Sequence, residues 1–205
     1  MGRPITCFKA YDIRGELVKQ LDENIAFRVG KALVDVLQAA TLVVGSDVRL
    51  TSFPLKLALA AGAIEAGAKV VDIGMVGTEE IYFATKELGV SAGIEVTASH
   101  NPINYNGMKI VKAGAVPISG DSGLRDIQKM AESYEDVDID KSLAMLAAHK
   151  YTQVNNDTFT SGIGIVSKSR LLQTDAYKEV DNRGPYVEHI GGYIEAQSLD
   201  NMKLV

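Results

Sequence analysis

The sequence has one cysteine, no tryptophan, and aromatic residues at only 6% of its 205 positions. Because Cys7 has no second cysteine to pair with, an internal disulfide is excluded, and we expect a reducing, cytoplasmic environment. No apolar run approaches the length of a membrane span, and the N-terminus lacks the apolar core of a signal peptide. The sequence therefore predicts no membrane partner.

An excess of positive charge is also absent. The chain has 21 Lys and Arg against 26 Asp and Glu, a net charge of −5, so it offers no general attraction for nucleic acid. A negatively charged substrate would need a local cluster of cationic side chains. The content of 46% hydrophobic and 23% charged residues is typical of a globular protein and excludes a disordered class.

Strand and helix patterns alternate along most of the chain. Short apolar runs predict strands at residues 5–8, 41–44, 69–73 and 91–97. Helical spacing and capping residues predict helices that begin at Asp22, at Thr51 or Ser52, at Thr78, at Asp121 or Ser122, and near Pro185. This alternation predicts an α/β fold, a three-layer sandwich with a mixed, mostly parallel sheet and helices on both faces.

The pattern weakens after residue 134. Residues 135–176 are first acidic and then polar, and we interpret them as an extended excursion within one domain that spans residues 1–198. Residues 202–205 have the pattern of an opening strand. We therefore expect residues 199–205 to begin a second domain that this chain does not complete.

Residues 97–109, Thr-Ala-Ser-His-Asn-Pro-Ile-Asn-Tyr-Asn-Gly-Met-Lys, concentrate reactive and polar groups. In open α/β sheets ligands bind beyond the carboxyl ends of the strands, and this segment starts where a predicted strand ends. Pro102 restricts the residue before it, and Asn106-Gly107 is typical of a tight turn. The pattern predicts a rigid functional loop that presents Ser99.

Ser99 could act in two ways. In a serine hydrolase, His100 would be its base, but adjacent residues of extended backbone point to opposite sides, and no Gly-x-Ser-x-Gly elbow surrounds the serine. Alternatively, Ser99 carries a phosphoryl group, whose nearly two negative charges His100 and Lys109 would help to balance. An ordinary polar turn is the weakest interpretation, because the segment is long and unusual in composition.

Three segments together resemble the phosphohexomutase superfamily, in particular the N-terminal portion of bacterial phosphomannomutases and phosphoglucomutases. They are Phe-Lys-Ala-Tyr-Asp-Ile-Arg-Gly at residues 8–15, Gly-Ser-Asp-Val-Arg at 45–49, and the segment 97–109. The likeness runs over about residues 8–131, and more weakly over 184–205. The segment 97–109 is highly specific for this superfamily, whereas the segment 45–49 alone would be weak evidence of membership. The resemblance implies the fold of the family's first domain.

The resemblance also implies an activity for the complete enzyme, the interconversion of mannose 6-phosphate and mannose 1-phosphate. Phosphorylated Ser99 would give its phosphoryl group to the substrate, and the hexose bisphosphate would reorient and return the other phosphate. Phosphoryl transfer depends on positioning and charge neutralisation. In the family, Mg²⁺ binds an oxygen of the serine phosphate, here on Ser99, and three Asp of the next domain. Phosphoglucomutase activity, or a non-catalytic binding module with the same fold, are the alternatives.

Three residues are the expected catalytic groups. Besides Ser99, the resemblance points to Lys109 as a general acid or base, with a simple phosphate clamp as the alternative. His100 would orient the phosphoryl group or the substrate, or would only stabilise the loop.

Further residues are expected around this centre. Tyr11, Arg14 and Asn101 would bind substrate or phosphate, because Arg suits bidentate phosphate contacts. We expect Asp47 and Arg49 to form a structural pair that supports the serine segment.

Several parts of the family's pattern have no counterpart in the sequence. These are the Asp-Gly-Asp-x-Asp-Arg metal loop, the Gly-Glu-x-Ser-Gly sugar loop and the C-terminal phosphate loop. We therefore expect no mutase activity from this polypeptide alone, and the expected partners are a hexose phosphate and the remaining domains of the same enzyme. His149 and His189 lie outside all motifs and are expected to be surface or packing residues.

Overall fold

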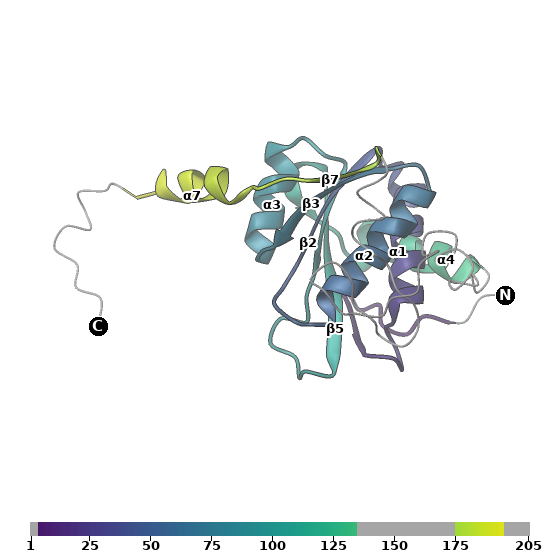
Figure 1. Ribbon diagram of the computed structural model, residues 1–205. Helices are drawn as coiled ribbons and strands as arrows, with labels where there is room; N and C mark the ends of the chain where they lie inside the picture. The colour runs from purple at the N-terminus through teal and green to yellow at the C-terminus, as the bar shows by residue number, and fades with distance from the viewer. Residues whose placement is uncertain (1–3, 135–174, 195–205) are drawn as a thin grey trace, which may run out of the picture.

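The computed structural model describes residues 4–134 and 175–194 (Figure 1). These residues form a seven-stranded sheet of order β1-β5-β4-β2-β3-β7, with β6 paired to β5. The strands are β1 (Ile13–Glu16), β2 (Thr41–Ser46), β3 (Lys69–Met75), β4 (Ala92–Val96), β5 (Tyr105–Lys112), β6 (Val116–Pro117) and β7 (Tyr177–Glu179). The helices are α1 (Glu23–Leu37), α2 (Ser52–Glu65), α3 (Thr78–Glu87), α4 (Leu124–Ser133) and α7 (Arg183–Gly191).

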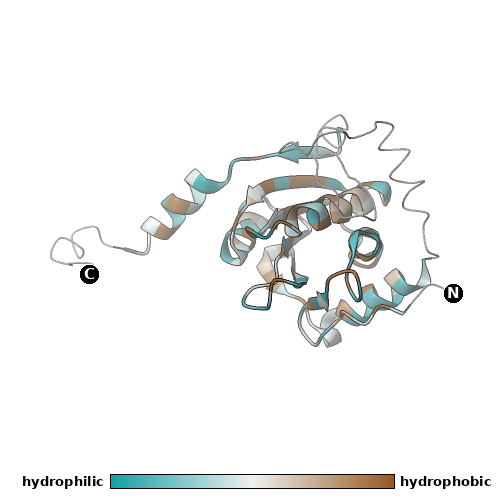
Figure 2. Ribbon diagram, turned by 60° about the horizontal axis from the view of Figure 1, so that its bottom comes forward, coloured by the Kyte–Doolittle hydropathy of each residue, from teal (hydrophilic) through white to brown (hydrophobic). Residues whose placement is uncertain are grey.

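The sheet is mixed, and helices cover both of its faces, so the predicted three-layer α/β fold is confirmed. Strand β2 pairs in parallel with β3 and β4, and β3 pairs in parallel with β7, whereas β5 is antiparallel to β1, β4 and β6. Helices α1, α2 and α4 enclose the larger hydrophobic core, and α3 covers a smaller core on the other face. Figure 2 shows hydrophobic residues along the sheet and the helices that flank it, while α7 extends away from the body.

Several sequence-based elements are confirmed with little change. Asp22 caps α1, since its Oδ1 accepts a hydrogen bond of 2.8 Å from the backbone N–H of Ile25. Pro185 lies in the first turn of α7. His189 packs its ring against Phe83 and Tyr193, as expected of a packing residue. None of the helices in the described residues is long and apolar enough to cross a bilayer.

The predicted strand at residues 5–8 is wrong. The chain turns back here, with an isolated bridge between Phe8 and Ile13, and the first strand is β1. Ile5 is buried because it meets α4: its N–H donates to Glu132 Oε1, and Gln128 donates to its carbonyl. The apolar pattern of this segment therefore reflects burial against a helix rather than strand pairing.

Two predicted caps are also wrong. Gly77 occupies the N-cap of α3, and Thr78 is already helical. Ser122 forms a capping box with Ser119 around a 3-10 turn, and Gly123 precedes α4. The predicted excursion, except for its last two residues, lies outside the described residues, as do His149 and the expected strand at 202–205.

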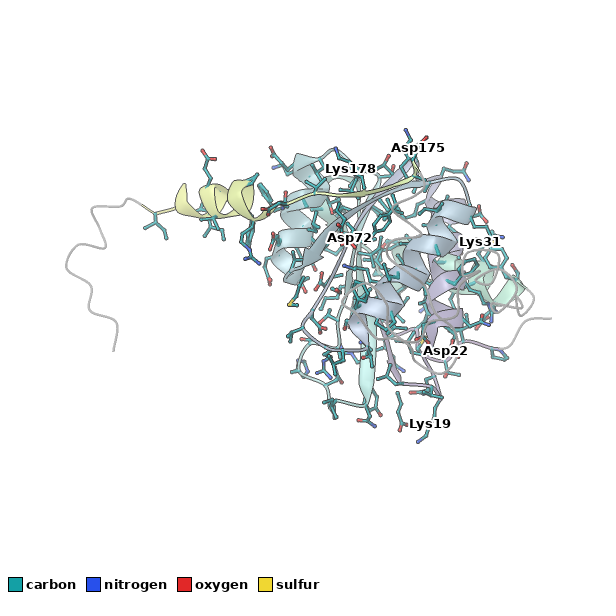
Figure 3. All side chains as sticks on the ribbon, in the orientation of Figure 1. Lys19, Asp22, Lys31, Asp72, Asp175 and Lys178 are labelled. Carbon is teal, nitrogen blue, oxygen red and sulfur yellow. The ribbon has the colours of Figure 1, made fainter. Side chains whose placement is uncertain are left out.

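A buried polar network fixes β7 to the sheet. The Asp72 carboxylate on β3, labelled in Figure 3, accepts a hydrogen bond from the Tyr177 hydroxyl of β7. Its other oxygen lies 2.8 Å from the ammonium of Lys56 on α2. Lys56 and Asp72 are both almost fully buried. Each compensates the charge of the other, and either charge would be costly to bury without a partner. The network joins β7, α2 and β3 in one cluster.

Helices α1 and α2 pack closely through a pair of glycines. A Cβ on Gly30 would lie 2.0 Å from the carbonyl oxygen of Leu59, and a Cβ on Gly62 would lie 2.0 Å from that of Phe27. Real Cβ atoms do not approach a backbone oxygen so closely. The two backbones can therefore meet only where each helix has no side chain.

This packing predicts that Gly62→Ala lowers the free energy of unfolding by about 2 kcal/mol, because the overpacking cost exceeds the ~1 kcal/mol that alanine gains in helix propensity. Urea unfolding measures the change. Gly184→Ala is the matched control, since a Cβ at this position in α7 meets no atom within 4 Å. Equal stability of Gly62→Ala and the parent would contradict the close approach.

Candidate active site at the serine loop

The residues between β4 and β5, 97–104, form a loop organised by the carboxylate of Asp47, which follows β2. Asp47 Oδ2 accepts hydrogen bonds from Thr97 Oγ1 at 2.8 Å and from the Ala98 N–H at 3.2 Å. Thr97 Oγ1 in turn accepts from the Ser99 N–H at 2.9 Å. The other carboxylate oxygen binds the hydroxyl of Ser52 at the start of α2. One side chain thus ties the loop to two neighbouring elements.

Arg49 also stabilises the loop, by binding its backbone carbonyls. Its guanidinium donates to the carbonyl of Pro102 at 2.8 Å and that of Ser99 at 3.1 Å, and also to the carbonyl of Asn101. Its Nε lies 3.7 Å from Asp47 Oδ2. The expected supporting role of Asp47 and Arg49 is confirmed by these contacts.

Ser99 has an uncommon backbone conformation, with φ of 52°, in the left-handed region. Such a conformation costs a non-glycine residue about 1–3 kcal/mol and persists only where its surroundings impose it. Here the contacts from Asp47, Thr97 and Arg49 impose it. The side chain is exposed at the carboxyl end of β4, where an α/β sheet binds its ligands.

The argument that Ser99 and His100 point to opposite sides is wrong, because the backbone is not extended. Ser99 Oγ lies 3.4 Å from His100 Nδ1, at the outer limit of a hydrogen bond. Within the described residues, His100 has no second partner that would orient it as a base. The pair therefore lacks the third group of a hydrolytic triad, and His100 is free to face an anion on Ser99.

The segment 97–109 is not a single loop, and the predicted turn at Asn106-Gly107 is wrong. These residues belong to β5, where they pair with Gly15 and Arg14 of β1. The fully buried Asn106 side chain donates to the hydroxyls of Thr51 and Ser52. Tertiary hydrogen bonds thus override the local turn preference.

The strand register places two expected site residues on one face of the sheet. Arg14 lies opposite Gly107, and Lys109 follows two residues later on β5, so both side chains project to the same side. Asp12 Oδ2 lies 2.6 Å from the Arg14 guanidinium and orients it. Lys109 is half-buried and has no hydrogen bond or ion pair with the described residues.

Two other candidates lie at the edge of this site. The Tyr11 side chain is 76% exposed and touches none of the site's polar groups by hydrogen bond. The Asn101 amide donates to the carbonyl of Ala98 at 2.7 Å, so one of its N–H groups shapes the loop. The structure therefore does not join either residue to Ser99 directly.

Glu95 is a site residue that we did not predict. It lies on β4 opposite Lys109, is 1% exposed, and has no hydrogen-bond partner among the described residues for either carboxyl oxygen. Burial, and secondarily the charge of Asp47, raises the pKa of Glu95 to about 9. An acid within the apolar strand Ala92–Val96 was the signal in the sequence.

No group of three acidic, histidine or cysteine side chains in the described part of the chain could hold a metal ion. The serine loop combines instead an exposed hydroxyl, nearby cationic side chains and a rigid backbone. This arrangement is suited to holding a phosphate ester, which needs positive charge and hydrogen-bond donors rather than a base of its own.

Comparison with known proteins gives this site a context. The model of the phosphoglucomutase/phosphomannomutase family, alpha/beta/alpha domain I, matches residues 6–138. A phosphomannomutase from Escherichia coli (strain K12) is 48% identical over 203 residues, covering 99% of this chain and 38% of the relative. A phosphomannomutase from Klebsiella pneumoniae is 65% identical over 128 residues, covering 62% of this chain and 82% of the relative.

A solved structure of a member of the same family is also similar to this chain. A phosphoglucomutase/phosphomannomutase family protein from Burkholderia thailandensis has a TM-score of 0.67 and 31% identity, covering 95% of this chain and 37% of the other. The chain therefore belongs to the phosphoglucomutase/phosphomannomutase family and carries its alpha/beta/alpha domain I. It spans 38% of the length of the Escherichia coli relative.

The contacts of Arg49 predict that Arg49→Lys loosens the serine loop, because an ammonium cannot reach several carbonyls in one plane. We expect hydrogen exchange of the Asn101 N–H, which binds the Ala98 carbonyl, to become about tenfold faster, equivalent to ~1.4 kcal/mol. Arg125→Lys is the control, since that exposed guanidinium lies 3.9 Å from Asp121. Unchanged exchange in Arg49→Lys would show that the loop holds its shape without the guanidinium.

Proposed function

We propose that this chain is the phosphoserine domain of a phosphomannomutase, in which Ser99 carries the phosphoryl group. The observation that supports this most is the conformation of Ser99, held exposed at the end of β4 by Asp47, Thr97 and Arg49. A serine that only closed a turn would not need such support. The names of the relatives favour mannose phosphates over glucose phosphates as substrate.

The reaction consists of two transfers. Oxygen O1 of mannose 6-phosphate attacks the phosphorus on Ser99, the bond from phosphorus to the serine oxygen breaks, and Lys109 passes the O1 proton to the departing Ser99 Oγ. After the bisphosphate has turned over, Ser99 Oγ attacks the phosphorus on O6, the bond from phosphorus to O6 breaks, and Lys109 passes the serine proton to O6. The product is mannose 1-phosphate, and phosphorylated Ser99 is restored.

The other candidates have supporting roles in this proposal. His100, whose Nδ1 lies 3.4 Å from Ser99 Oγ, orients the phosphoryl group on that oxygen. Arg14 binds a substrate phosphate from the same sheet face as Lys109, with Tyr11 beside it. Asn101 offers to the phosphate the amide N–H that the loop does not use.

Mg²⁺ is the metal that we propose for the complete enzyme, where it would neutralise charge on the transferred group. The described residues do not fit a metal site by themselves, because the loop supplies only the oxygens of a phosphate on Ser99. The remaining ligands would come from other domains of the same enzyme, which we place in the cytoplasm. In this proposal residues 1–198 form domain I, and residues 199–205 begin the next domain.

The role of Ser99 is tested in the full-length protein. Ser99→Ala should reduce turnover at least a thousandfold, because the neighbouring Thr97 hydroxyl is already bound to Asp47 and cannot replace that of Ser99. Phosphopeptide mapping of the parent should place the phosphate on residue 99. Ser119→Ala, in the 3-10 turn, is a control that should keep full activity. Phosphate on a different residue, together with an active Ser99→Ala, would disprove the assignment.

A further prediction concerns the isolated 205-residue chain. Mg²⁺ requires six oxygens in octahedral geometry, and a phosphate on Ser99 supplies one or two. Calorimetric titration should therefore detect no tight Mg²⁺ binding, and a coupled assay should detect no conversion of mannose 6-phosphate. Tight binding or turnover would show that the chain is sufficient by itself.

A further inference from the structure

Glu95 is a buried acid on β4 that the proposed reaction does not use. Its side chain is 1% exposed, and neither carboxyl oxygen has a hydrogen-bond partner among the described residues. A carboxylate without hydrogen bonds or a paired cation is costly to bury, and such a group becomes neutral by keeping its proton. The surroundings of Glu95 therefore determine whether the folded chain contains the acid or the carboxylate.

The carboxyl group of Glu95 lies against apolar side chains. A Cβ on Gly45 of β2 would lie 3.0 Å from Glu95 Oε2. The same Cβ would lie 2.4 Å from Val76 Cγ2 and 2.9 Å from Ile81 Cδ1, so these atoms and the carboxyl oxygen surround one small space. Val76 lies in the connection from β3 to α3, and Ile81 belongs to the core under α3. The carboxyl is thus enclosed between the sheet and α3.

The charged groups around Glu95 do not favour its carboxylate. Three of the groups that act on it are acids, one after β2 and two in the first turn of α3: Asp47, Glu79 and Glu80. Lys56 on α2 also acts on Glu95, but it is bound to Asp72 at 2.8 Å. Lys109 lies opposite Glu95 in the strand register and is not among the groups that act on it. Repulsion from the acids therefore adds to the cost of a buried charge.

We propose that Glu95 is a pH-sensitive switch in this fold: the folded chain holds it as the neutral acid, and its ionisation destabilises the packing of α3 on the sheet. The unfolded chain exposes the same carboxyl to water, where it is ionised at neutral pH. Folding at neutral pH therefore takes up one proton from the solvent, which forms the O–H bond of Glu95. This inference goes beyond the proposed function and does not depend on the role of Ser99.

The direction of the pH dependence follows from the two protonation states. Burial, and secondarily the charge of Asp47, raises the pKa of Glu95 to about 9 in the folded chain, against about 4.3 for an exposed glutamate. Between these two values the unfolded chain has lost the proton and the folded chain has kept it, so stability falls as the pH rises. Below this range both states are protonated, and above it both are ionised, so the dependence ends there.

The test is urea unfolding of the 205-residue chain at about pH 6 and about pH 8, for the parent and for Glu95→Gln. Glutamine has nearly the shape of the protonated acid but cannot ionise. The contributions of all other titrating groups therefore cancel in the ratio of the two unfolding constants. This ratio, parent over Glu95→Gln, should rise about tenfold for each pH unit, or about a hundredfold between the two conditions.

Glu87→Gln is the matched control for this experiment. It removes an exposed acid at the C-terminal end of α3, so the ratio of its unfolding constant to that of the parent should not change with pH. If the ratio for Glu95→Gln also rises by less than about threefold between the two conditions, the folded chain does not keep the proton and the inference is overturned.

A second measurement needs no variant. Carbon-13 NMR of the side-chain carboxyl of Glu95 in the parent chain should show a protonated acid at neutral pH, with the midpoint of its titration at about pH 9. A midpoint below about pH 6 would place the carboxyl in the ordinary range of an acid and would overturn the inference, even if Glu95→Gln did not fold.

Discussion

The carboxylate of Asp47 is the group on which the organisation of this site depends. It accepts four hydrogen bonds, from the backbone of Arg49 and Ala98 and from the hydroxyls of Ser52 and Thr97. Hydrogen bonds to a charged acceptor contribute more than neutral ones, about 1.5–3 kcal/mol each. These partners lie in the connection from β2 to the start of α2 and in the loop after β4, so one anion joins two segments that are 50 residues apart in sequence.

The sheet provides the second half of the site. Its register brings Arg14 of β1 and Lys109 of β5 to the face that also carries Glu95 of β4. The helices on the other face, packed through Gly30 and Gly62, contribute rigidity rather than chemistry. Two cationic side chains, Arg14 and Lys109, thus share one face of the sheet in a chain whose net charge is −5.

Local sequence patterns correctly predicted the elements whose formation depends on neighbouring residues in the chain. The cap at Asp22 and the helical spacing after it predicted α1, and the position of Ser99 at the end of a strand was predicted from the apolar run before it. The strand β5 was missed because Asn106-Gly107 has turn propensity. Pairing with β1 and β4, and the bonds from Asn106 to hydroxyls more than fifty residues away, hold these residues in a strand instead.

In the site, too, the features that depend on contacts between distant residues could not be predicted from the sequence. The composition of the loop pointed to Ser99, but its left-handed backbone depends on contacts from Thr97 and Arg49 that no spacing reveals. For this reason the expected separation of Ser99 and His100 was wrong. Glu95 was overlooked because only the pairing of β4 with β5 shows that it faces Lys109.

The central claim is that the phosphoryl group on Ser99 passes to the substrate. The most direct measurement is a single-turnover experiment, in which phosphorylated full-length protein is mixed with one equivalent of mannose 6-phosphate and quenched at short times. The account predicts that the peptide containing Ser99 loses one phosphoryl group as a hexose bisphosphate forms at the same rate. Isomerisation of the sugar while Ser99 keeps its phosphate throughout would contradict it.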